Sequence, residues 1–435
     1  MKAVIIAILA ALAGTFVANA ENWAQWRGPA FNGSSAESNL PDDFSPTKNV
    51  KWTVPLPGES AATPIIWGDR VFISSSQEKD KTLRAICIDK KNGKVLWDQE
   101  VAIGFSQDDK SNFASPSPAT DGSLVVFLYG NGNLAAFDFE GKKLWARQLE
   151  KDYGQFAYQW TYGASPLLFD GKLFIQVLQR DEPVHGRGKG SGIESYLLAL
   201  EPRTGKELWR HVRPSDARME SHEAYSTPTP FEYQGRTELI VVGGDCITGH
   251  SPKDGAELWR WGTWNPTKIT HWRLVPSSVT GGGVVLACAP KGSPIYALKA
   301  GLKGTQDDSA IAWKSSDREV SSDVGTPLFY KGRFYILNGD RKTISRVEPA
   351  TGKVDWTGDL ESRIKIESSP TGGDDKIYFQ NFRGEVFIVA AADKFQLIRK
   401  ITMGDESDAD LRSSISISDG DLFIRTGHKL FCVGK

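Results

Sequence analysis

Cysteine is scarce in this chain of 435 residues, and neither sign of charge prevails. The four cysteines, Cys87, Cys246, Cys288 and Cys432, lie far apart and include no C-x-x-C pair. This spacing excludes a disulfide-dense scaffold and the standard zinc patterns, and it leaves open whether Cys246 and Cys288 pair. The formal net charge of −1 argues against nucleic acid or an anionic membrane as a partner held by bulk electrostatics.

Familiar catalytic motifs are missing as well. The chain has six histidines and no G-x-S-x-G elbow, so nothing favours a hydrolase. In MESHEAYS, at residues 219–226, a second histidine four residues after His222 would suggest zinc, but that position is Ser226. HGRGKGSG, at 185–192, lacks the phosphate-binding loop pattern. It belongs to a stretch, 179–192, that we expect to be an exposed insertion.

Long apolar runs are absent after the N-terminus. There, Lys2 precedes an apolar run over residues 3–17, and the small residues ANA follow at 18–20. This is the pattern of a cleaved secretory signal peptide, so we expect residues 1–20 to be removed and the protein to be exported to the periplasm or the extracellular space. No cysteine follows the cut, which argues against a lipid anchor, and we expect no transmembrane segment.

What the chain does contain is an internal repeat. The pattern G-x-x-x-W occurs five times, ending at Trp97, Trp145, Trp209, Trp259 and Trp356. Between these tryptophans lie Gly/Asp turns and short runs of β-branched or aromatic residues, which are signals for strands joined by tight turns. Four short strands in each unit of about 40–50 residues predict an all-β fold, the β-propeller, with one sheet per blade.

The number of units predicts eight blades. Seven units begin with a small residue and a proline, and an eighth, which lacks the proline, begins at Arg412. The last unit ends without a tryptophan, but NVKW at 49–52 supplies a spare closing strand. We therefore expect this N-terminal strand to complete the last blade and close the ring over residues 50–435. Residues 21–49 should pack on the propeller through Trp23 and Trp26, or else form a detachable arm that binds a partner.

The repeated tryptophans have a structural explanation. Each blade must bury its faces against its neighbours, and a tryptophan gives each interface a large apolar side chain. We therefore assign a blade-docking role, not a ligand-binding one, to Trp52, Trp97, Trp145, Trp209, Trp259, Trp313 and Trp356. Cys87 and Cys432 occupy the position that alanine fills in other units, so we expect small buried core residues there.

The repeat A-x-D-x-x-T-G-x-x-x-W, present as CIDKKNGKVLW, ALEPRTGKELW and VEPATGKVDW, resembles that of the pyrroloquinoline quinone (PQQ) β-propellers. Quinoprotein alcohol dehydrogenases and outer-membrane assembly lipoproteins of the BamB type share the fold of these propellers. WAQWRGP and NVKW resemble exported PQQ-like repeat proteins. Such a resemblance is specific for the fold and poor for function, because the repeated residues are those that join the blades.

The chain differs from both families that the resemblance implies, the dehydrogenases and the assembly lipoproteins. The dehydrogenases carry an adjacent cysteine pair over the quinone and a calcium site made of Glu, Asn and Asp. This chain has no such pair and is shorter, and no calcium-ligand motif can be matched. The assembly lipoproteins begin at a lipidated cysteine, where this chain has Glu21. We therefore expect no metal and no cofactor, with PQQ and calcium as the alternative.

Candidate binding residues follow from the propeller geometry, because the innermost strand of each blade lines the central channel. Residues just before each Ser/Thr-Pro start should lie at its mouth. These are Glu59, Asn112, Tyr162, His222, Glu223, Trp272, Arg273, Asp323, Glu367 and Arg412. They can bind a ligand together, or neutralise one another around a water-filled channel.

The sequence thus predicts an exported, monomeric, non-catalytic propeller that binds or scaffolds a protein, glycan or small molecule. One alternative is a PQQ- and calcium-dependent dehydrogenase with Asp323 or Glu367 as base. Another is an assembly factor that adds a peptide strand to the outer edge of a blade.

Overall fold

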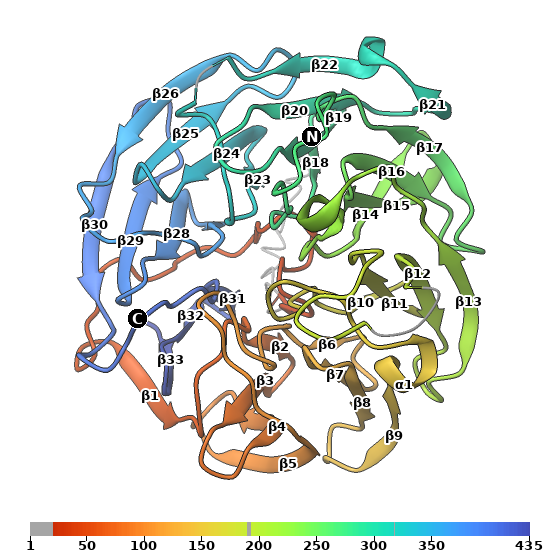
Figure 1. Ribbon diagram of the computed structural model, residues 1–435. Helices are drawn as coiled ribbons and strands as arrows, with labels where there is room; N and C mark the ends of the chain where they lie inside the picture. Colours follow the sequence, from red (N-terminus) through yellow and green to blue (C-terminus); the bar gives the residue numbers. More distant parts are fainter. Residues whose placement is uncertain (1–20, 189–192, 317) are drawn as a thin grey trace, which may run out of the picture.

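Eight sheets surround a central channel in the computed structural model, which describes residues 21–188, 193–316 and 318–435. Figure 1 shows them as the blades of a ring, each with its first strand nearest the axis and its last strand at the rim. The predicted eight-bladed β-propeller is therefore confirmed. The predicted signal peptide, residues 1–20, and the end of the predicted insertion lie outside the described residues.

The first four blades run in chain order from the axis to the rim. Blade 1 is β2 (Ile65–Trp67), β3 (Arg70–Gln77), β4 (Thr82–Asp89) and β5 (Val95–Ile103). Blade 2 is β6 (Ala119–Thr120), β7 (Val125–Leu128), β8 (Asn133–Phe137) and β9 (Lys143–Gln148). Blade 3 is β10 (Leu167–Phe169), β11 (Lys172–Val177), β12 (Tyr196–Leu200) and β13 (Glu207–Val212). Blade 4 is β14 (Thr229–Tyr233), β15 (Arg236–Gly243), β16 (Cys246–His250) and β17 (Glu257–Trp261).

The other four blades repeat this arrangement. Blade 5 is β18 (Val279–Gly281), β19 (Val284–Cys288), β20 (Ile295–Lys299) and β22 (Ile311–Lys314). Blade 6 is β23 (Leu328–Tyr330), β24 (Arg333–Asn338), β25 (Thr343–Val347) and β26 (Val354–Asp359). Blade 7 is β27 (Thr371–Gly373), β28 (Lys376–Gln380), β29 (Glu385–Ala390) and β30 (Leu397–Thr402). Blade 8 is β31 (Ser416–Ser418), β32 (Asp421–Arg425), β33 (Lys429–Val433) and β1 (Val50–Pro55).

Blade 8 closes the ring with strands from both ends of the propeller. β1 pairs antiparallel with β33, so that Trp52 lies opposite Cys432. The predicted closure by the N-terminal strand is therefore confirmed. Closure stabilises the ring because it pairs both terminal strands and leaves no sheet open at the point where the circle is joined.

Blade 4 departs from four strands. The short strand β21 (Gly304–Gln306), from the connection inside blade 5, pairs parallel with β17 at the rim and gives this sheet a fifth strand. Helical structure in the described residues is limited to α1 (Leu149–Tyr153) and two 3-10 turns, Met219–His222 and Asp308–Ala310. None of these helices is long and apolar enough to cross a membrane.

The repeated tryptophans lie on the outermost strands and contact the following blade. The indole N–H of Trp52 donates to the carbonyl of Lys90, and that of Trp97 to the carbonyl of Phe139. Trp145, Trp313 and Trp356 make the same bond to the next blade, to Pro202, Pro349 and Ala392. Each indole therefore joins apolar packing to one directed hydrogen bond.

Two tryptophans deviate from this pattern. Trp209 packs against Gly255 of blade 4, but its indole N–H has no partner among the described residues. The indole N–H of Trp259 donates to Glu238 of its own blade, at 2.9 Å. Both deviations involve blade 4, the blade that also carries the additional strand. The contacts between blades thus vary where the rim is built differently.

The residue paired with each tryptophan is small in most blades. Cys432 lies opposite Trp52, Cys87 opposite Trp97, and Ala136 opposite Trp145. A small side chain leaves room for the indole on the neighbouring strand. All four cysteines are buried and none forms a disulfide, so Cys246 and Cys288 are not paired.

The segment from Trp23 to Ser35 crosses one end of the channel. Trp23 pairs with Ile66 of blade 1, and the carbonyl of Ala24 accepts from Thr120 of blade 2. On the other side of the axis, the carbonyl of Asn32 accepts from the backbone N–H of Phe329 in blade 6, and the backbone of Ser35 donates to Gly372 of blade 7. We call residues 23–35 the closing segment, because its bonds reach blades on opposite sides of the ring.

Arg27 holds the closing segment from inside. Its guanidinium is almost completely buried and donates to the carbonyls of Asn32, Pro327 and Pro370. Burial lowers the pKa of Arg27 to about 9, since a charged group is less stable away from water. The segment therefore fills this end with a side chain whose two terminal nitrogens donate to backbone carbonyls.

Candidate functional site: the cup inside the channel

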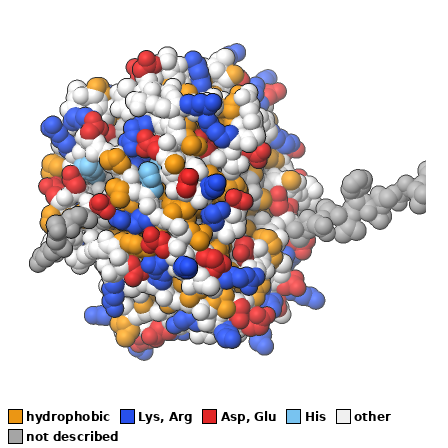
Figure 2. Space-filling view, turned by 90° about the vertical axis from the view of Figure 1, so that its right-hand side faces the viewer, with side chains coloured by type: hydrophobic (Ala, Val, Ile, Leu, Met, Phe, Trp, Pro, Cys, Tyr) orange, Lys and Arg blue, Asp and Glu red, His pale blue; other side chains and the backbone are white. Residues whose placement is uncertain are grey.

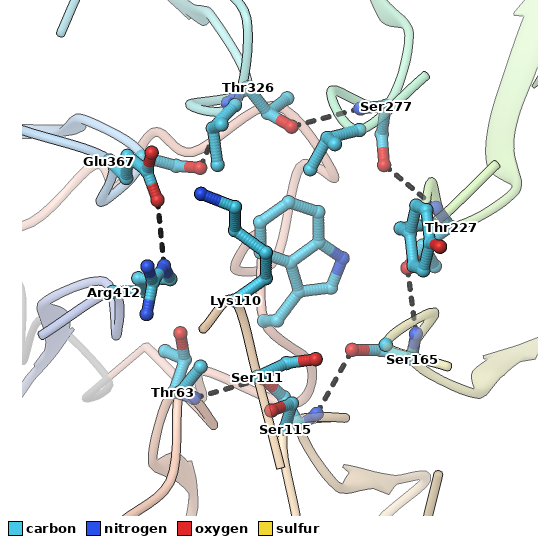
Figure 3. A pocket seen from close by; sticks show the side chains of 18 of the residues that line it. Thr63, Lys110, Ser111, Ser115, Ser165, Thr227, Ser277, Thr326, Glu367 and Arg412 are labelled. Atoms are coloured by element: carbon cyan, nitrogen blue, oxygen red, sulfur yellow. Dashed lines mark hydrogen bonds and ion pairs between the residues drawn. The ribbon is translucent and has the colours of Figure 1, made fainter. Parts of the chain in front are cut away.

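A belt of hydrogen bonds encircles the channel where the innermost strands begin (Figure 3). In each bond, the backbone N–H of a serine or threonine donates to the hydroxyl of the equivalent residue in the next blade, at 2.8–3.3 Å. Ser414 closes the circle by donating to Thr63. We call these eight residues the hydroxyl belt: Thr63, Ser117, Ser165, Thr227, Ser277, Thr326, Ser369 and Ser414.

The sequence explains why the belt forms at this position. In six of the eight blades a proline follows the belt residue. Proline favours an extended conformation in the residue before it and offers no N–H of its own. The backbone N–H of each belt residue would otherwise be buried without an acceptor, and the hydroxyl of the next blade supplies one.

The belt surrounds a cavity of about 160 Å³, and the closing segment crosses one end of the channel. Trp26, from the closing segment, is part of the cavity wall. The guanidinium of Arg27 lies 5.4 Å from the ring centre of Trp26. The channel is therefore a cup with an aromatic floor and a belt of hydroxyls around its wall.

Two ion pairs between neighbouring blades lie at the open end. Arg273 makes a bidentate pair with Asp323, at 3.3 and 3.1 Å, and Arg412 binds Glu367 at 2.7 Å. Lys365 also contacts Glu367, at 2.7 Å. Burial alone would raise the pKa of Asp323, but the charge and hydrogen bonds of Arg273 lower it. Arg273 therefore favours the ionised form of Asp323, and Glu367 is engaged by two cations, Arg412 and Lys365.

One cation of the mouth has no acidic partner. Lys110 lies in an exposed loop between blades 1 and 2, and no ion pair of its side chain occurs in the described part of the chain. Its ammonium is 5.8 Å from the ring centre of Trp160. Figure 3 shows Lys110 extending inside the belt, with Arg412 and Glu367 to one side. Lys110 is thus free to bind a ligand.

A buried network lies behind the mouth. Glu223 is inaccessible to solvent and accepts from Tyr225 at 2.6 Å and from the backbone of Gln159 at 3.1 Å, and it pairs with Arg180. Burial raises the pKa of Glu223, and these bonds act in the opposite direction. Tyr225 lines the cup and its hydroxyl also accepts from the backbone N–H of Trp160. This network fixes two aromatic rings of the wall.

The ten residues predicted at the mouth do not converge on one site. Arg273, Glu367 and Arg412 line the cup. Glu59 and Asn112 line a shallow hollow beside it, and Asp323 faces a separate hollow between blades 5 and 6. The other four do not line the cup: Tyr162 donates to Gln176 in the core, His222 contacts Asp181, Glu223 is buried, and Trp272 is held through its backbone by Ser221.

The sequence reasoning missed several residues of the cup: Trp26, Lys110, Trp160, Tyr225 and the belt. A signal for the belt was present, because a hydroxyl residue precedes the proline in unit after unit. That position was used only to count the repeats. Lys110, Trp160 and Trp26 lie in loops and in the closing segment, outside any repeated pattern.

The residues present do not match the calcium and quinone site that the resemblance implies. Within the described ranges, no three His, Cys, Asp or Glu side chains lie close enough to hold a metal ion. Asp323 and Glu367 are engaged by cations, so their oxygens are not available as ligands. The four cysteines are buried inside the sheets, not over the cup.

Comparison with known proteins agrees with this fold. A family model described as outer membrane protein assembly factor BamB matches residues 45–179 and 245–434, which is about three quarters of the chain. A polyvinylalcohol dehydrogenase of Pseudomonas sp. is 26% identical over 170 residues. The match covers 38% of this chain and 25% of the relative, so the chain spans about a quarter of that relative's length.

Solved structures with a similar fold include members of both groups of proteins. The quinohemoprotein alcohol dehydrogenase from Comamonas testosteroni has a TM-score of 0.66 and 13% identity, covering 95% of this chain and 81% of the other. BamB from Moraxella catarrhalis has a TM-score of 0.58 and 12% identity, covering 88% of this chain and 99% of the other. Likeness at such low identity shows the shared propeller and leaves the function open.

Proposed function

This chain belongs to the PQQ-repeat family described as outer membrane protein assembly factor BamB, and from that premise we propose that it is an exported, non-catalytic binding propeller. The ligand is taken at the open end of the cup. The observation that carries the proposal is the cup itself: the closing segment seals one end, while aromatic and cationic side chains line the other. A concave site with a few convergent polar groups is the usual form of a ligand site.

The state of the mouth carboxylates supports binding without catalysis. A general base works best when its pKa lies near the working pH and its oxygens can reach the substrate. Arg273 lowers the pKa of Asp323, and Glu367 lies between Arg412 and Lys365. Both carboxylates are thereby engaged by cations and are well placed to hold the two arginines in position.

A dehydrogenase is the main alternative, because the matched relative is named polyvinylalcohol dehydrogenase. The test is a calorimetric titration of the purified chain with PQQ, with and without calcium, followed by an alcohol assay with an artificial electron acceptor. Our proposal predicts no calcium-dependent binding and no reduction of the acceptor. Calcium-dependent binding in the micromolar range together with acceptor reduction would overturn it.

Strand addition at the rim is the second alternative, and one contact favours it. β21 pairs with β17 at the edge of blade 4, so the rim of a blade does accept a further strand. A ligand found by thermal-shift screening separates the two modes. If the ligand binds in the cup, Trp160→Leu abolishes the shift and Ile103→Lys on the rim strand β5 does not; the opposite result favours the rim.

Export is part of the same proposal and is tested separately. If residues 1–20 act as a signal peptide, the mature protein starts at Glu21 and is found outside the cytoplasm. N-terminal sequencing of the protein from fractionated cells checks both points. A cytoplasmic protein that retains Met1 would contradict export without affecting the binding site.

A further inference from the structure

Resting on the proposed function, we infer that the cup selects a small, flat, negatively charged ligand: a single aromatic ring that carries a carboxylate. Three features of the cup point to this class independently. They are the free protons of the hydroxyl belt, the excess of positive charge, and the aromatic floor in a cavity that admits about one ring.

The hydroxyl belt offers donors to whatever occupies the cup. Each belt oxygen accepts one hydrogen bond, from the backbone of the neighbouring blade. No acceptor for any of the eight hydroxyl protons occurs within the described residues, and all eight residues line the cavity. A hydroxyl that already accepts a bond has its proton left to donate. A wall of donors favours an anion over a cation.

The charges of the cup point in the same direction. Lys110, Arg273 and Arg412 line it, and among the described residues of its wall the carboxylate is that of Glu367. Beneath the floor, Arg27 is buried and has only carbonyl partners. Asp323 compensates Arg273 from outside the cup, which leaves Lys110 and Arg27 without acidic partners in the described part of the chain. Because Arg27 is buried, its charge acts on a ligand more strongly than a charge at the surface would.

The size of the cavity favours a ligand of about one ring. Trp26, Trp160 and Tyr225 supply flat apolar surfaces around the cup, and flat rings pack well on such faces. The volume of about 160 Å³ is comparable to a cavity that holds one benzene molecule. A ring with one carboxylate fits this space with the charge directed at Lys110.

The test measures the binding of benzoate and of its neutral analogue benzamide to the full mature chain by ligand-observed NMR. We expect benzoate to bind with a dissociation constant of roughly 1 mM or below, and benzamide at least about tenfold more weakly. Benzoate binding should also weaken as salt is raised from 20 to 300 mM, while benzamide binding should not change, because salt screens only the charged ligand.

The variant Lys110→Gln tests whether Lys110 causes the preference for benzoate over benzamide. Lys110 is exposed, so its replacement leaves the fold intact, which circular dichroism checks. We expect about fivefold weaker benzoate binding and unchanged benzamide binding. Lys253→Gln, at an exposed turn of the rim in blade 4, is the matched control and should change neither.

The outcomes separate this inference from the proposed function. Equal binding of benzoate and benzamide overturns the anion selectivity but leaves a binding cup. Failure of both probes overturns the inference outright, while the thermal-shift screen still decides whether the cup binds another ligand. Tight benzoate binding that Lys110→Gln does not alter also overturns it, because the charge would then act from somewhere else.

Discussion

Two rings of repeated residues run around this molecule, and they differ in regularity. The outer ring consists of the rim tryptophans and their contacts with the next blade; it changes at Trp209 and Trp259, and at Trp356 the paired residue is Arg346, not a small one. The inner ring, the hydroxyl belt, makes the same bond in all eight blades. Apolar packing tolerates varied partners, whereas a buried N–H needs an acceptor at one place.

The two rings also differ in what surrounds them. The outer ring lies between blades at the rim, where Trp145, Trp209 and Trp356 are partly exposed, and the surface around it carries interspersed charges of both signs (Figure 2). The inner ring faces the cup. We therefore expect changes in the outer ring to alter stability, and changes in the inner ring to alter both stability and ligand binding.

Breaking the outer ring should have the largest effect. Gly352, at φ 74°, packs against Trp313 of blade 5, and an added Cβ would lie 2.5 Å from the indole. Gly171, at φ 69°, has the same backbone conformation but no atom within 4 Å of such a Cβ. We expect Gly352→Ala to lower the free energy of unfolding by about 3 kcal/mol and Gly171→Ala by about 1 kcal/mol.

Urea denaturation measures the difference in the free energy of unfolding between the two glycine variants. The backbone strain cancels in this difference, because both glycines have the same backbone conformation. The remaining 2 kcal/mol or so is the cost of displacing the indole. Equal losses in the two variants would mean that the tryptophan adjusts freely, and that the outer ring does not hold blades 5 and 6 together.

The outer ring should also be sensitive to pH where it is irregular. His250 is fully buried and directly follows Gly249, the residue that pairs with Trp259. Burial lowers the pKa of His250 to about 3, so the unfolded chain takes up a proton at a higher pH than the folded chain. The stability contributed by neutral His250 is complete above pH 6.5 and is lost as the pH falls, by about 2 kcal/mol between pH 7 and pH 5.

The pH effect is measured as a difference between proteins. Burial raises the pKa of Asp245 in the same blade to about 6, which acts with the opposite sign, since protonation on acidification favours the folded form. In urea denaturation at pH 7 and pH 5, His250→Gln should not show the loss of about 2 kcal/mol that neutral His250 causes. His271→Gln, at an exposed site, should show the same loss as the wild type. Identical pH slopes for wild type and His250→Gln would contradict the prediction.

Breaking the inner ring at one position should have the smallest effect. Ser165→Ala removes the acceptor of the Ser117 N–H, and we expect a loss of about 1 kcal/mol in urea denaturation. Ser165→Thr keeps the hydroxyl, as Thr63 and Thr227 do in other blades, so it should cost less than about 0.5 kcal/mol. If Ser165→Thr is as unstable as Ser165→Ala, space in the belt and not the hydrogen bond limits this position.

The sequence alone determined the propeller, the number of blades and the closure by β1. It could do so because each blade needs the same local signals, a turn glycine, alternating apolar strands and a rim tryptophan, and repetition makes those signals countable. The small residues opposite the tryptophans, such as Cys87 and Cys432, were visible for the same reason.

Only the tertiary structure decided which polar residues share a site. Adjacent residues just before the start of a repeat unit differ in where they lie: Arg273 lines the cup, while Trp272 beside it does not. Lys110, Trp160 and Trp26 meet there although they come from two loops and the closing segment, because ring closure brings segments together that are far apart in the chain. The direction of a loop side chain depends on packing from several blades at once, and no local pattern encodes that.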